Sequence, residues 1–346
     1  YLVGWGRITS IEPLVTVGGG LYYDGDDYVI ELAYNYAGVH GLAMVNPSGK
    51  GVLATAYHNW LDYVDILAKY MGVHGNPSSL TTDLRVRHSF VRCVGDVSGS
   101  VGIYNRMISD CTFIDVLIMG YDIGIWVRQP DTYIALCHSM RWPSTSISEG
   151  IRVEHNHTHV IGSFVDGNPT YGIHDLSCDF NLYLGNFIRV AAGGYGIYFN
   201  PPTSKTINGC KVFGNQIEGL DSSNLGDTAI AYGPNVTGLF ATQISGNFIR
   251  WFNNVGLRSE NNGKATFSGD GSTTQFAIPH GIFVPYNSYI DKGEVEVTPA
   301  SADAAGDFYV TVDKDYIYVN YKTAPPSGTD NVVLRWRVRY VDRDHT

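Results

Sequence analysis

Five residues that could bind a sugar recur at one fixed place in this sequence, two positions after a glycine. They are Tyr104, Trp126, Arg152, His174 and Tyr198. Aromatic rings can stack on sugar rings, while arginine and histidine can bind hydroxyl or carboxylate groups. Aliphatic neighbours flank most of the five, so strand alternation would place their side chains on one outer face. The pattern indicates a glycan-binding groove; the alternative is an ordinary outer face covered by a loop or a neighbouring subunit.

The carboxylates nearest to this face are Glu154 and Asp175. Hydrolysis of a glycosidic bond needs two carboxyl groups, ~5–5.5 Å apart for retention or ~6.5–9.5 Å apart for inversion, and strands ~4.8 Å apart could supply either. Glu154 and Asp175 are therefore a candidate catalytic pair. Simple alternation, however, places the Asp175 side chain inward. Either a bulge redirects this side chain outward, or Asp175 is a buried acid with a raised pKa. A lyase would instead use a base such as His174 or Tyr198, with Arg152 neutralising a uronate carboxylate.

Three histidines, His155, His157 and His159, alternate and would share one face of a strand. Three imidazoles could bind zinc or copper. They lie, however, where a turn should follow the strand, and no cysteine or further histidine is spaced to join them. We expect a polar corner here, and neither a metal nor another cofactor.

Two recurring motifs indicate which elements position these residues. The first reads polar, usually Phe, aliphatic, charged, and its seven copies begin 23 to 32 residues apart at Ser89, Thr112, His138, Ser163, Asn186, Asn215 and Asn247. The second, Gly-Ile, alternates with it at Gly102, Gly124, Gly150, Gly172 and Gly196. Repeats of roughly 20–50 residues indicate a stacked-repeat architecture, and motifs this rich in Val, Ile and Phe belong to strands. The chain is predicted to be all-β, with successive rungs of a parallel β-helix.

Stacked rungs turn equivalent positions into columns. We expect an aliphatic column to face inward: Val91, Ile114, Met140, Val165, Ile188, Ile217 and Ile249. The next residues alternate in charge and should form an ion-pair column that stabilises the rung register: Arg92, Asp115, Arg141, Asp166, Arg189, Glu218 and Arg250. The asparagines that begin the last three copies suit a turn in which stacked amides bond to one another.

The phenylalanines of the first motif predict an assembly. Alternation points five of them outward: Phe90, Phe113, Phe164, Phe187 and Phe248. They would form an apolar strip larger than monomers usually leave exposed. A strip parallel to the solenoid axis is naturally covered by parallel neighbours around a rotational axis, so we expect a homotrimer. The alternatives are that the rings bend into the monomer core or that residues 1–88 cover them.

Composition narrows the class of protein. The 346 residues include 40 glycines and 24 tyrosines with only 16% charged residues, which favours a turn-rich all-β chain. A net charge of −10 argues against nucleic acid, and no apolar run approaches the ~20 residues of a membrane span. An odd cysteine count without metal-type spacing indicates buried thiols, with Cys111–Cys137 the one candidate disulfide. Because the chain opens at Tyr1 without an initiator Met, we expect further sequence upstream.

Three zones are predicted along the chain. Residues 1–88 read as irregular early rungs with one short helix, because Trp60, Val64, Leu67 and Met71 fall at helical spacing. Residues 89–262 are the regular parallel β-helix. Residues 263–346 contain alternating strands separated by Pro/Gly/Ser turns, which is typical of a small antiparallel β-sandwich.

These motifs resemble a known architecture. Gly196-Ile197-Tyr198-Phe199, followed by Ile207-Asn208 and Asn215-Gln216-Ile217, resembles the right-handed parallel β-helix of the pectate-lyase-like superfamily. Together with a small C-terminal β domain, it resembles a viral (phage) tailspike or tail fibre. The segments 267–274 and 297–306 are similar to C-terminal modules of viral tail and secreted β-helix proteins.

The resemblance implies an extracellular or virion-surface homotrimer that binds, and often cleaves, cell-surface polysaccharide. As an enzyme it would be a depolymerase, either a glycoside hydrolase or a polysaccharide lyase. The alternatives are a non-catalytic glycan-binding adhesin or fibre, and a structural subunit of an extracellular filament. A fold alone does not transfer function.

Overall fold

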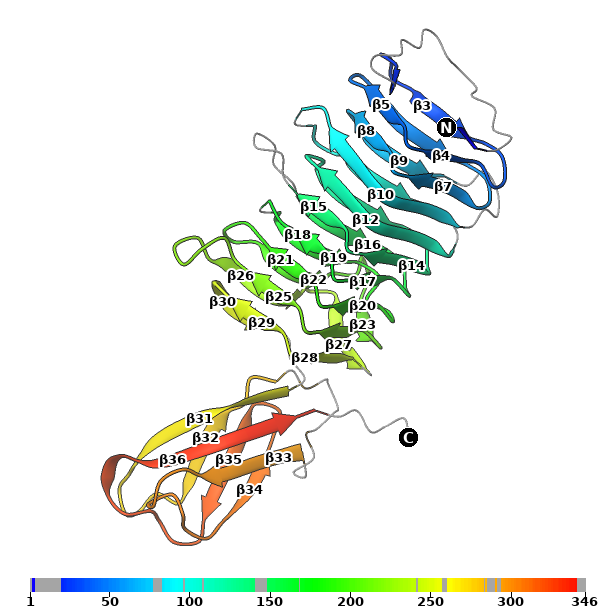
Figure 1. The fold of residues 1–346 in the computed structure, drawn as a ribbon. Coiled ribbons are helices and arrows are strands. Elements are labelled where there is room, and N and C mark those ends of the chain that lie inside the picture. Colours follow the sequence, from blue (N-terminus) through cyan, green and yellow to red (C-terminus); the bar gives the residue numbers. More distant parts are fainter. Residues whose placement is uncertain are drawn as a thin grey trace. The chain divides into compact units, whose positions relative to one another are not determined.

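The computed structural model describes residues 2–3, 20–76, 83–95, 97–107, 109–140, 148–167, 169–240, 242–256, 260–282, 284, 290 and 294–340. The chain forms two compact units, the first running to Gly256 except for segments 206–208 and 237–245, which group with the second. Every regular element among the described residues is a strand (Figure 1), which confirms the all-β prediction.

The first unit is a parallel β-solenoid in which each rung contributes three strands. Strands β19 (Tyr171–Asp175), β20 (Leu182–Leu184) and β21 (Phe187–Arg189) make up one such rung. Equivalent strands of successive rungs pair in parallel and form three rows along the solenoid. We call the rows that contain β20, β21 and β19 the first, second and third row. The predicted parallel β-helix is confirmed.

The bounds of the remaining solenoid strands follow. The first row also contains β4 (Gly38–His40), β7 (Asn59–Asp62), β14 (Thr132–Ala135), β17 (His159–Ile161) and β24 (Lys211–Phe213), and β1 (Leu2–Val3) pairs antiparallel with β4. The second row also contains β2 (Gly20–Tyr22), β5 (Ala43–Asn46), β8 (Asp65–Ala68), β15 (His138–Met140), β18 (Phe164–Val165), β25 (Gln216–Glu218) and β29 (Phe248–Arg250). Strands β10 (Leu84–Cys93) and β12 (Cys111–Met119) run through both rows.

The third row also contains β3 (Tyr28–Leu32), β6 (Lys50–Ala54), β9 (Met71–Gly75), β11 (Val101–Asn105), β13 (Ile123–Val127), β16 (Glu149–Val153), β22 (Tyr195–Phe199), β26 (Gly226–Tyr232) and β30 (Phe252–Gly256). Strands β23 (Lys205–Asn208) and β27 (Val236–Phe240) form a two-stranded sheet, and β28 spans Gln243–Ser245.

The aliphatic column of the second row follows the predicted register at most of its positions. Val91, Val165, Ile188 and Ile217 are fully buried. Ile188 pairs in parallel with Ile217, and Ile217 pairs with Ile249. The prediction that equivalent aliphatic residues stack in one inward column is therefore confirmed for these rungs.

One copy of the first motif was assigned to the wrong row, and another was shifted by one residue within the second row. Val91 pairs with Ile118, and Ile118 pairs with Ser139, so these residues occupy the places predicted for Ile114 and Met140. The segment that begins at Thr112 belongs instead to the first row. Inward and outward positions there are the reverse of those predicted for the second row. Phe113 is consequently buried in the core rather than exposed in the apolar strip.

The error propagates to the charged column. Only its last four members stack as predicted: Arg189 lies 3.9 Å from Asp166 and 3.5 Å from Glu218, and Glu218 also pairs with Arg250 at 2.6 Å. Arg92 pairs with Asp65 rather than with Asp115. Arg141 lies outside the described residues.

A left-handed residue forms the corner between the first and second rows in each rung for which this corner is described. These corner residues have φ values of 48–65° and are Gly41, Tyr63, His88, Asp115, Leu136, Gly162, Gly185, Gly214 and Gly246. The asparagines that follow the last three corners stack as predicted. Asn186 Nδ2 donates to Asn215 Oδ1 at 2.9 Å, and Asn215 Nδ2 donates to Asn247 Oδ1 at 2.9 Å.

The Gly-Ile motif is explained by close packing between the second and third rows. A Cβ added at Gly51, Gly72, Gly102, Gly124, Gly150, Gly172 or Gly196 would overlap the inward side chain of a second-row residue. At Gly172 that side chain belongs to Ile188, and at Gly196 it belongs to Ile217. The glycine column is therefore required by the aliphatic column opposite it.

The helix predicted around Trp60 is wrong. The segment forms β7, β8 and β9, with Leu61 and Ile66 fully buried by alternation within the two short strands. Tyr63, a corner residue, separates β7 from β8. The apparent helical spacing arose because the corner at Tyr63 interrupts the strand alternation. Trp60 and Val64 are four residues apart, as on one face of a helix, but Trp60 points outward and Val64 is buried.

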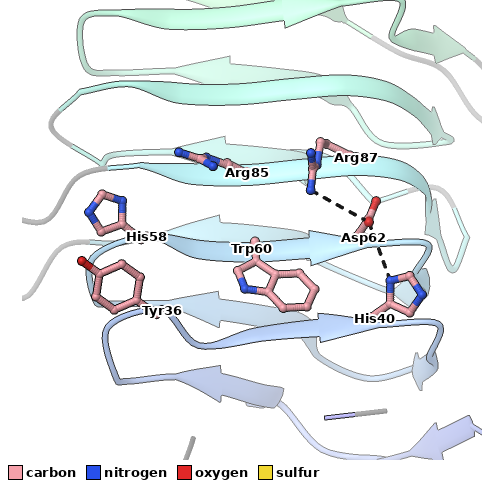
Figure 2. Close-up of a pocket in the computed structure, with 7 residues that line it drawn as sticks. All are labelled: Tyr36, His40, His58, Trp60, Asp62, Arg85 and Arg87. Carbon is pink, nitrogen blue, oxygen red and sulfur yellow. Dashed lines mark ion pairs between the residues drawn. The ribbon is translucent and has the colours of Figure 1, made fainter. Parts of the chain in front are cut away.

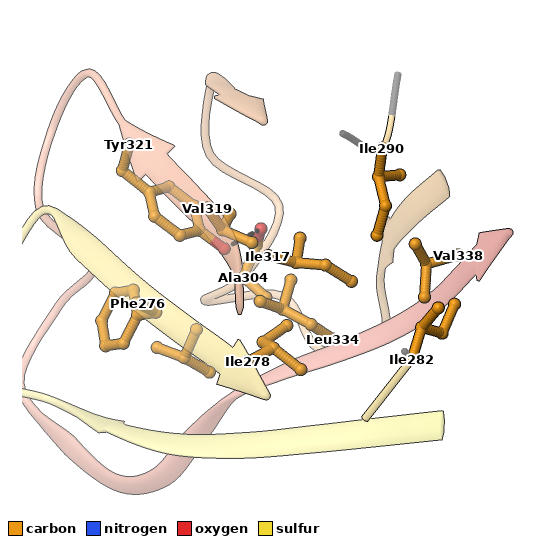
Figure 3. Packing of buried hydrophobic residues seen from close by; sticks show 11 residues of the cluster. Phe276, Ile278, Ile282, Ile290, Ala304, Ile317, Val319, Tyr321, Leu334 and Val338 are labelled. Carbon is orange, nitrogen blue, oxygen red and sulfur yellow. Dashed lines mark hydrogen bonds between the residues drawn. The ribbon is translucent and has the colours of Figure 1, made fainter. Parts of the chain in front are cut away.

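The second unit contains two three-stranded antiparallel sheets, in agreement with the predicted small β-sandwich. One has the order β31 (Glu260–Gly269), β36 (Gly328–Arg339), β33 (Val295–Pro299), and the other the order β32 (Gln275–Pro279), β35 (Tyr316–Tyr321), β34 (Phe308–Val312). Figure 3 shows their shared core, to which Phe276, Ile317 and Leu334 contribute. The five cysteines of the chain are free and buried, as predicted.

Candidate functional site

The structure brings the five predicted sugar-binding residues together on the outer side of the third row. Tyr104, Trp126, Arg152, His174 and Tyr198 pair in this order between neighbouring strands. His74 extends the column at one end and Ala231 at the other. Arg258, which stands two positions after Gly256 and would continue the column, lies outside the described residues. All five predicted residues are half-buried except His174, which is buried.

The rings of this column stack on one another rather than facing solvent. Tyr104 lies 5.0 Å from His74 and 4.8 Å from Trp126 between ring centroids, and Arg152 covers Trp126 at 4.6 Å. Because stacked neighbours occupy the ring faces, the column offers a ligand mainly ring edges. This arrangement suits a stabilising ladder better than a sugar platform.

Arg152 is neutralised within the protein. Its Nε donates to Oε2 of Glu149 at 2.7 Å, and Glu149 also lies 3.2 Å from His174 Nδ1. Burial alone would raise the pKa of Glu149, but His174 and Arg152 beside the carboxylate outweigh burial and lower that pKa. Glu149 was not among the predicted site residues. It stands three residues before Arg152 and returns to the same outer face because Gly150 and Ile151 both point inward.

The structure places Glu154 and Asp175, the predicted carboxyl pair, in different surroundings. Glu154 follows β16 at the surface and pairs with Arg128 at 2.7 Å. Asp175 points into the core, is fully buried, and accepts hydrogen bonds from Ser177, Cys178, Asn181 and Tyr183. Asp175 thus has the inward position that strand alternation within β19 predicts. Its carboxylate accepts hydrogen bonds from the turn that follows the strand.

The three alternating histidines do not converge. His155 bonds to its neighbour Asn156, His157 is a left-handed residue that precedes β17, and His159 lies on β17. In the described part of the chain, no three His, Cys, Asp or Glu side chains are placed to hold a metal ion.

A cavity of about 630 Å³ opens instead on the outer side of the first row (Figure 2). Its lining combines aromatic, basic and acidic side chains: Tyr36, His40, His58, Trp60, Asp62, Arg85 and Arg87. We call it the Trp60 cavity. None of these residues was among the predicted site residues.

Strand register places these side chains. Gly38 pairs with Trp60 and Trp60 with Arg85, while His40 pairs with Asp62 and Asp62 with Arg87. The residues between them, Val39, Leu61 and Val86, are fully buried. Alternation thus sends two adjacent polar or aromatic columns outward over three rungs.

The missing side chain of Gly38 lets the Trp60 ring lie flat on the sheet. A Cβ added at Gly38 would overlap ring atoms of Trp60, and Figure 2 shows the indole directed towards the strand of His40, with Arg85 and Arg87 on the strand on the opposite side of Trp60. One face of the ring is thereby supported by backbone, and the other faces the cavity.

Tyr36 and His58, two left-handed residues that precede the strands, line one rim of the cavity, and the left-handed Asp83 contacts His58. The Tyr36 ring stacks on His58 at 4.8 Å, and His58 Nδ1 lies 2.7 Å from Asp83 Oδ2. Arg85 donates to the same carboxylate through Nε at 2.7 Å. Burial would raise the pKa of Asp83, but the hydrogen bonds from Arg85 and His58 lower it overall, so that the Asp83 carboxylate holds both side chains in place.

Asp62 occupies the opposite rim beside Arg87. Its carboxylate lies 2.9 Å from His88 Nδ1, 3.6 Å from His40 Nδ1 and 3.9 Å from an Arg87 nitrogen. Nε of Arg87 is buried with no hydrogen-bond partner among the described residues. The Arg87 side chain as a whole is 40% exposed, so its guanidinium group retains donor capacity that a bound acceptor could use.

The cavity was missed because residues 1–88 were treated as irregular. A signal was present: Gly38-Val39-His40, Trp60-Leu61-Asp62 and Arg85-Val86-Arg87 repeat at rung spacing with one aliphatic residue in the middle. Aligning these triplets would have placed Trp60 and the two arginines on one outer face.

Comparison with known proteins shows which solved structures have a similar fold. The sequence matches no protein-family model and no curated protein. Among solved structures, the tailspike protein gp49 from Pseudomonas phage LKA1 aligns with a TM-score of 0.60 at 12% identity, over 92% of this chain and 62% of that chain. The fold is similar to that of a phage tailspike.

Two further tailspikes match with lower TM-scores. One is a mutant of the E. coli bacteriophage HK620 tailspike in complex with a hexasaccharide (TM-score 0.39, 11% identity, 92% of this chain and 75% of that chain). The other is gp49 from Acinetobacter baumannii bacteriophage Fri1, a capsular polysaccharide depolymerase (0.39, 12%, 92% and 70%). At these identities the tailspike similarity concerns the fold. The chain spans 62% of the length of the Pseudomonas phage tailspike.

The structure also addresses a membrane span. Over the described ranges, no helical segment has the length and apolar character that crossing a bilayer requires.

Proposed function

We propose that this protein is a tailspike-like protein of a virion surface that binds a cell-surface polysaccharide in the Trp60 cavity. The observation that carries the proposal is the Trp60 ring, which lies flat over Gly38 beside Arg85 and Arg87. A sugar ring can stack on the free indole face while the arginines bind hydroxyl or carboxylate groups. The tailspike-like fold supports the placement on a virion.

The cavity favours a sugar that carries a negative charge. Arg85 donates a hydrogen bond to Asp83, but Arg87 comes no closer than 3.9 Å to Asp62, which His88 approaches more closely. A ligand carboxylate can form short, charge-assisted bonds with Arg87 at little cost in broken internal contacts. Because the chain as a whole has a net charge of −10, an acidic glycan needs such a local cation.

Removing the platform should weaken binding. Trp60→Ala is expected to lower affinity for the bound polysaccharide at least roughly ten-fold, or ~1.4 kcal/mol, measured by calorimetry after screening a panel of bacterial capsular polysaccharides. Arg87→Gln should weaken binding of acidic members of the panel more than of neutral ones.

Trp126→Ala is the matched control, because Trp126 lies on the third row between Tyr104 and Arg152. Loss of binding in Trp126→Ala together with normal binding in Trp60→Ala would move the site to the originally predicted face.

Cleavage of the bound polysaccharide is a second candidate function, which the position of Asp62 favours. Its partly exposed carboxylate lines the cavity between two histidines, where it can exchange a proton with a bound sugar. If the wild-type protein releases reducing ends from a polysaccharide, Asp62→Asn should lower that rate by at least roughly a hundred-fold.

The products identify the reaction class. A product with the ultraviolet absorbance of an unsaturated uronate indicates a lyase, and reducing ends without it indicate a hydrolase. Binding by the wild type without release of reducing ends would indicate a non-catalytic adhesin.

We also propose that the protein acts as a homotrimer. The outward column of the second row contains Phe90, Leu117, His138, Phe164, Phe187, Gln216 and Phe248 in register. Phe90, Phe164 and Phe248 are at least half exposed. An apolar strip of this length is more than a monomer usually presents to water, and the ion pairs of Arg189 and Glu218 beside it can set the height of a parallel neighbour.

Light scattering should therefore give a mass of about three times the 38.0 kDa of one chain. Replacing both Phe164 and Phe248 by Ser should shift the mass towards that of the monomer, whereas Tyr309→Ser, at an exposed ring of the second unit, should not. A wild-type mass near 38.0 kDa at micromolar concentration would contradict the proposal.

A further inference from the structure

A second, smaller hollow lies on the same row as the Trp60 cavity. It has a volume of about 320 Å³ and is lined by Asp131, Thr132, Tyr133, His157 and His159. These residues come from β14 and β17 and from the corners that precede them. None of them lines the Trp60 cavity.

The two hollows are built from the same structural columns. Tyr133 occupies the outward column of Trp60 and Arg85, with Thr112 between Arg85 and Tyr133. Asp131 has the same left-handed corner conformation as His58 and precedes its strand position by the same two residues. The solenoid thus repeats, three strands further on, the arrangement of an aromatic ring beside a polar corner.

The surface between the two hollows can accommodate a chain. Thr112, a short side chain, is the residue of this column between Arg85 and Tyr133. Three strand steps of ~4.8 Å separate Trp60 from Tyr133, or roughly 14 Å along the solenoid. An oligosaccharide of a few linked rings covers such a span.

We propose that one polysaccharide chain lies lengthwise along the first row, with one sugar at Trp60 and a second sugar on Tyr133. This inference rests on the proposed function of the Trp60 cavity. The Tyr133 ring is 38% exposed and meets the neighbouring His159 edge-on, at 6.5 Å, rather than face-to-face.

The second hollow selects a different sugar from the first. Of the described residues, no arginine or lysine lines it, and its charged group is the half-exposed carboxylate of Asp131, 3.7 Å from His157 Nδ1. That carboxylate can accept hydrogen bonds from sugar hydroxyls and repels an anionic sugar. The ligand is therefore a heteropolysaccharide that places a neutral sugar a few rings from an acidic one.

The test uses oligosaccharides of increasing length, prepared by partial acid hydrolysis of the panel polysaccharide that binds, and measures affinity by calorimetry with the full chain. Tyr133→Ala should weaken binding of the longer oligosaccharides roughly ten-fold while leaving the shortest binding fragments unchanged. Trp60→Ala should weaken all lengths. Tyr133→Phe, which keeps the ring, should retain most of the affinity, and Tyr309→Ala in the second unit serves as the surface control.

The outcomes separate this inference from the proposed function. If Trp60→Ala loses binding while Tyr133→Ala binds every length as the wild type does, the second subsite is wrong and the first stands. Equal weakening of short and long fragments by Tyr133→Ala also overturns the lengthwise arrangement. If neither variant weakens binding, the proposed function of the Trp60 cavity fails as well.

Discussion

Replacing Gly172 with valine is expected to prevent the solenoid from folding at ordinary temperature. The first carbon of any side chain there would overlap Cγ2 of Ile188 and approach the backbone carbonyl oxygen of Gly196 in the next rung. Neither neighbour can move freely, because Ile188 is fully buried and Gly196 belongs to a parallel ladder. Overpacking typically costs about 1–3 kcal/mol for small additions, so Gly172→Ala should already destabilise by that amount and valine by more.

Urea unfolding followed by circular dichroism measures this effect. Gly193→Ala is the control, because Gly193 has a left-handed φ of 71° but nothing close to an added Cβ. Gly193→Ala should lower the free energy of unfolding only by the about 1–2 kcal/mol that a left-handed conformation costs a non-glycine residue. Equal stability of Gly172→Val and wild type would mean that the second and third rows are further apart than the structure places them.

Asn215→Ala is expected to destabilise the solenoid by about 3–5 kcal/mol, because it leaves several buried groups without partners. Asn215 Oδ1 accepts from the backbone nitrogen of Asn186 at 3.0 Å and from its Nδ2 at 2.9 Å. Asn215 Nδ2 donates to the carbonyl oxygen of Tyr183 and to Asn247 Oδ1, both at 2.9 Å. Water cannot replace these bonds, since Asn215 is fully buried.

The matched control is Asn224→Ala. Asn224 is exposed and its side chain bonds only to Asp221 among the described residues, so its loss should change stability by less than about 0.5 kcal/mol. Thermal unfolding of the two variants side by side gives the comparison. Similar midpoints for Asn215→Ala and Asn224→Ala would show that the amide stack contributes nothing to stability.

The parts of the fold that could be predicted from sequence are those in which one residue type is forced by a neighbour in the next rung. The glycine opposite Ile188 and the stacked amides of Asn186 and Asn215 are such cases, and both recur in the sequence as motifs. The register failed at Thr112, whose segment imitates the second-row motif but lies in the first row. A corner residue shifts the strand period by one, and its left-handed conformation is not confined to glycine here, as Asp115 shows.

The candidate site was less predictable than the fold. Alternation correctly brought Trp126 and Arg152 to one outer face, but it could not show that their side chains would cover each other. Ring stacking depends on side-chain rotamers, which a one-dimensional pattern does not contain. For Asp175, by contrast, alternation alone indicated burial, and the structure agrees.

The central claim is that the Trp60 cavity holds a sugar, and a crystal structure with a bound oligosaccharide tests it most directly. The oligosaccharide should come from a capsular polysaccharide that the wild-type protein binds. We expect a sugar ring stacked on Trp60, an acidic group within hydrogen-bond distance of Arg87, and the chain directed towards Tyr133. Electron density for the sugar against Tyr104 and Tyr198 on the third row, with the Trp60 cavity empty, would contradict the account.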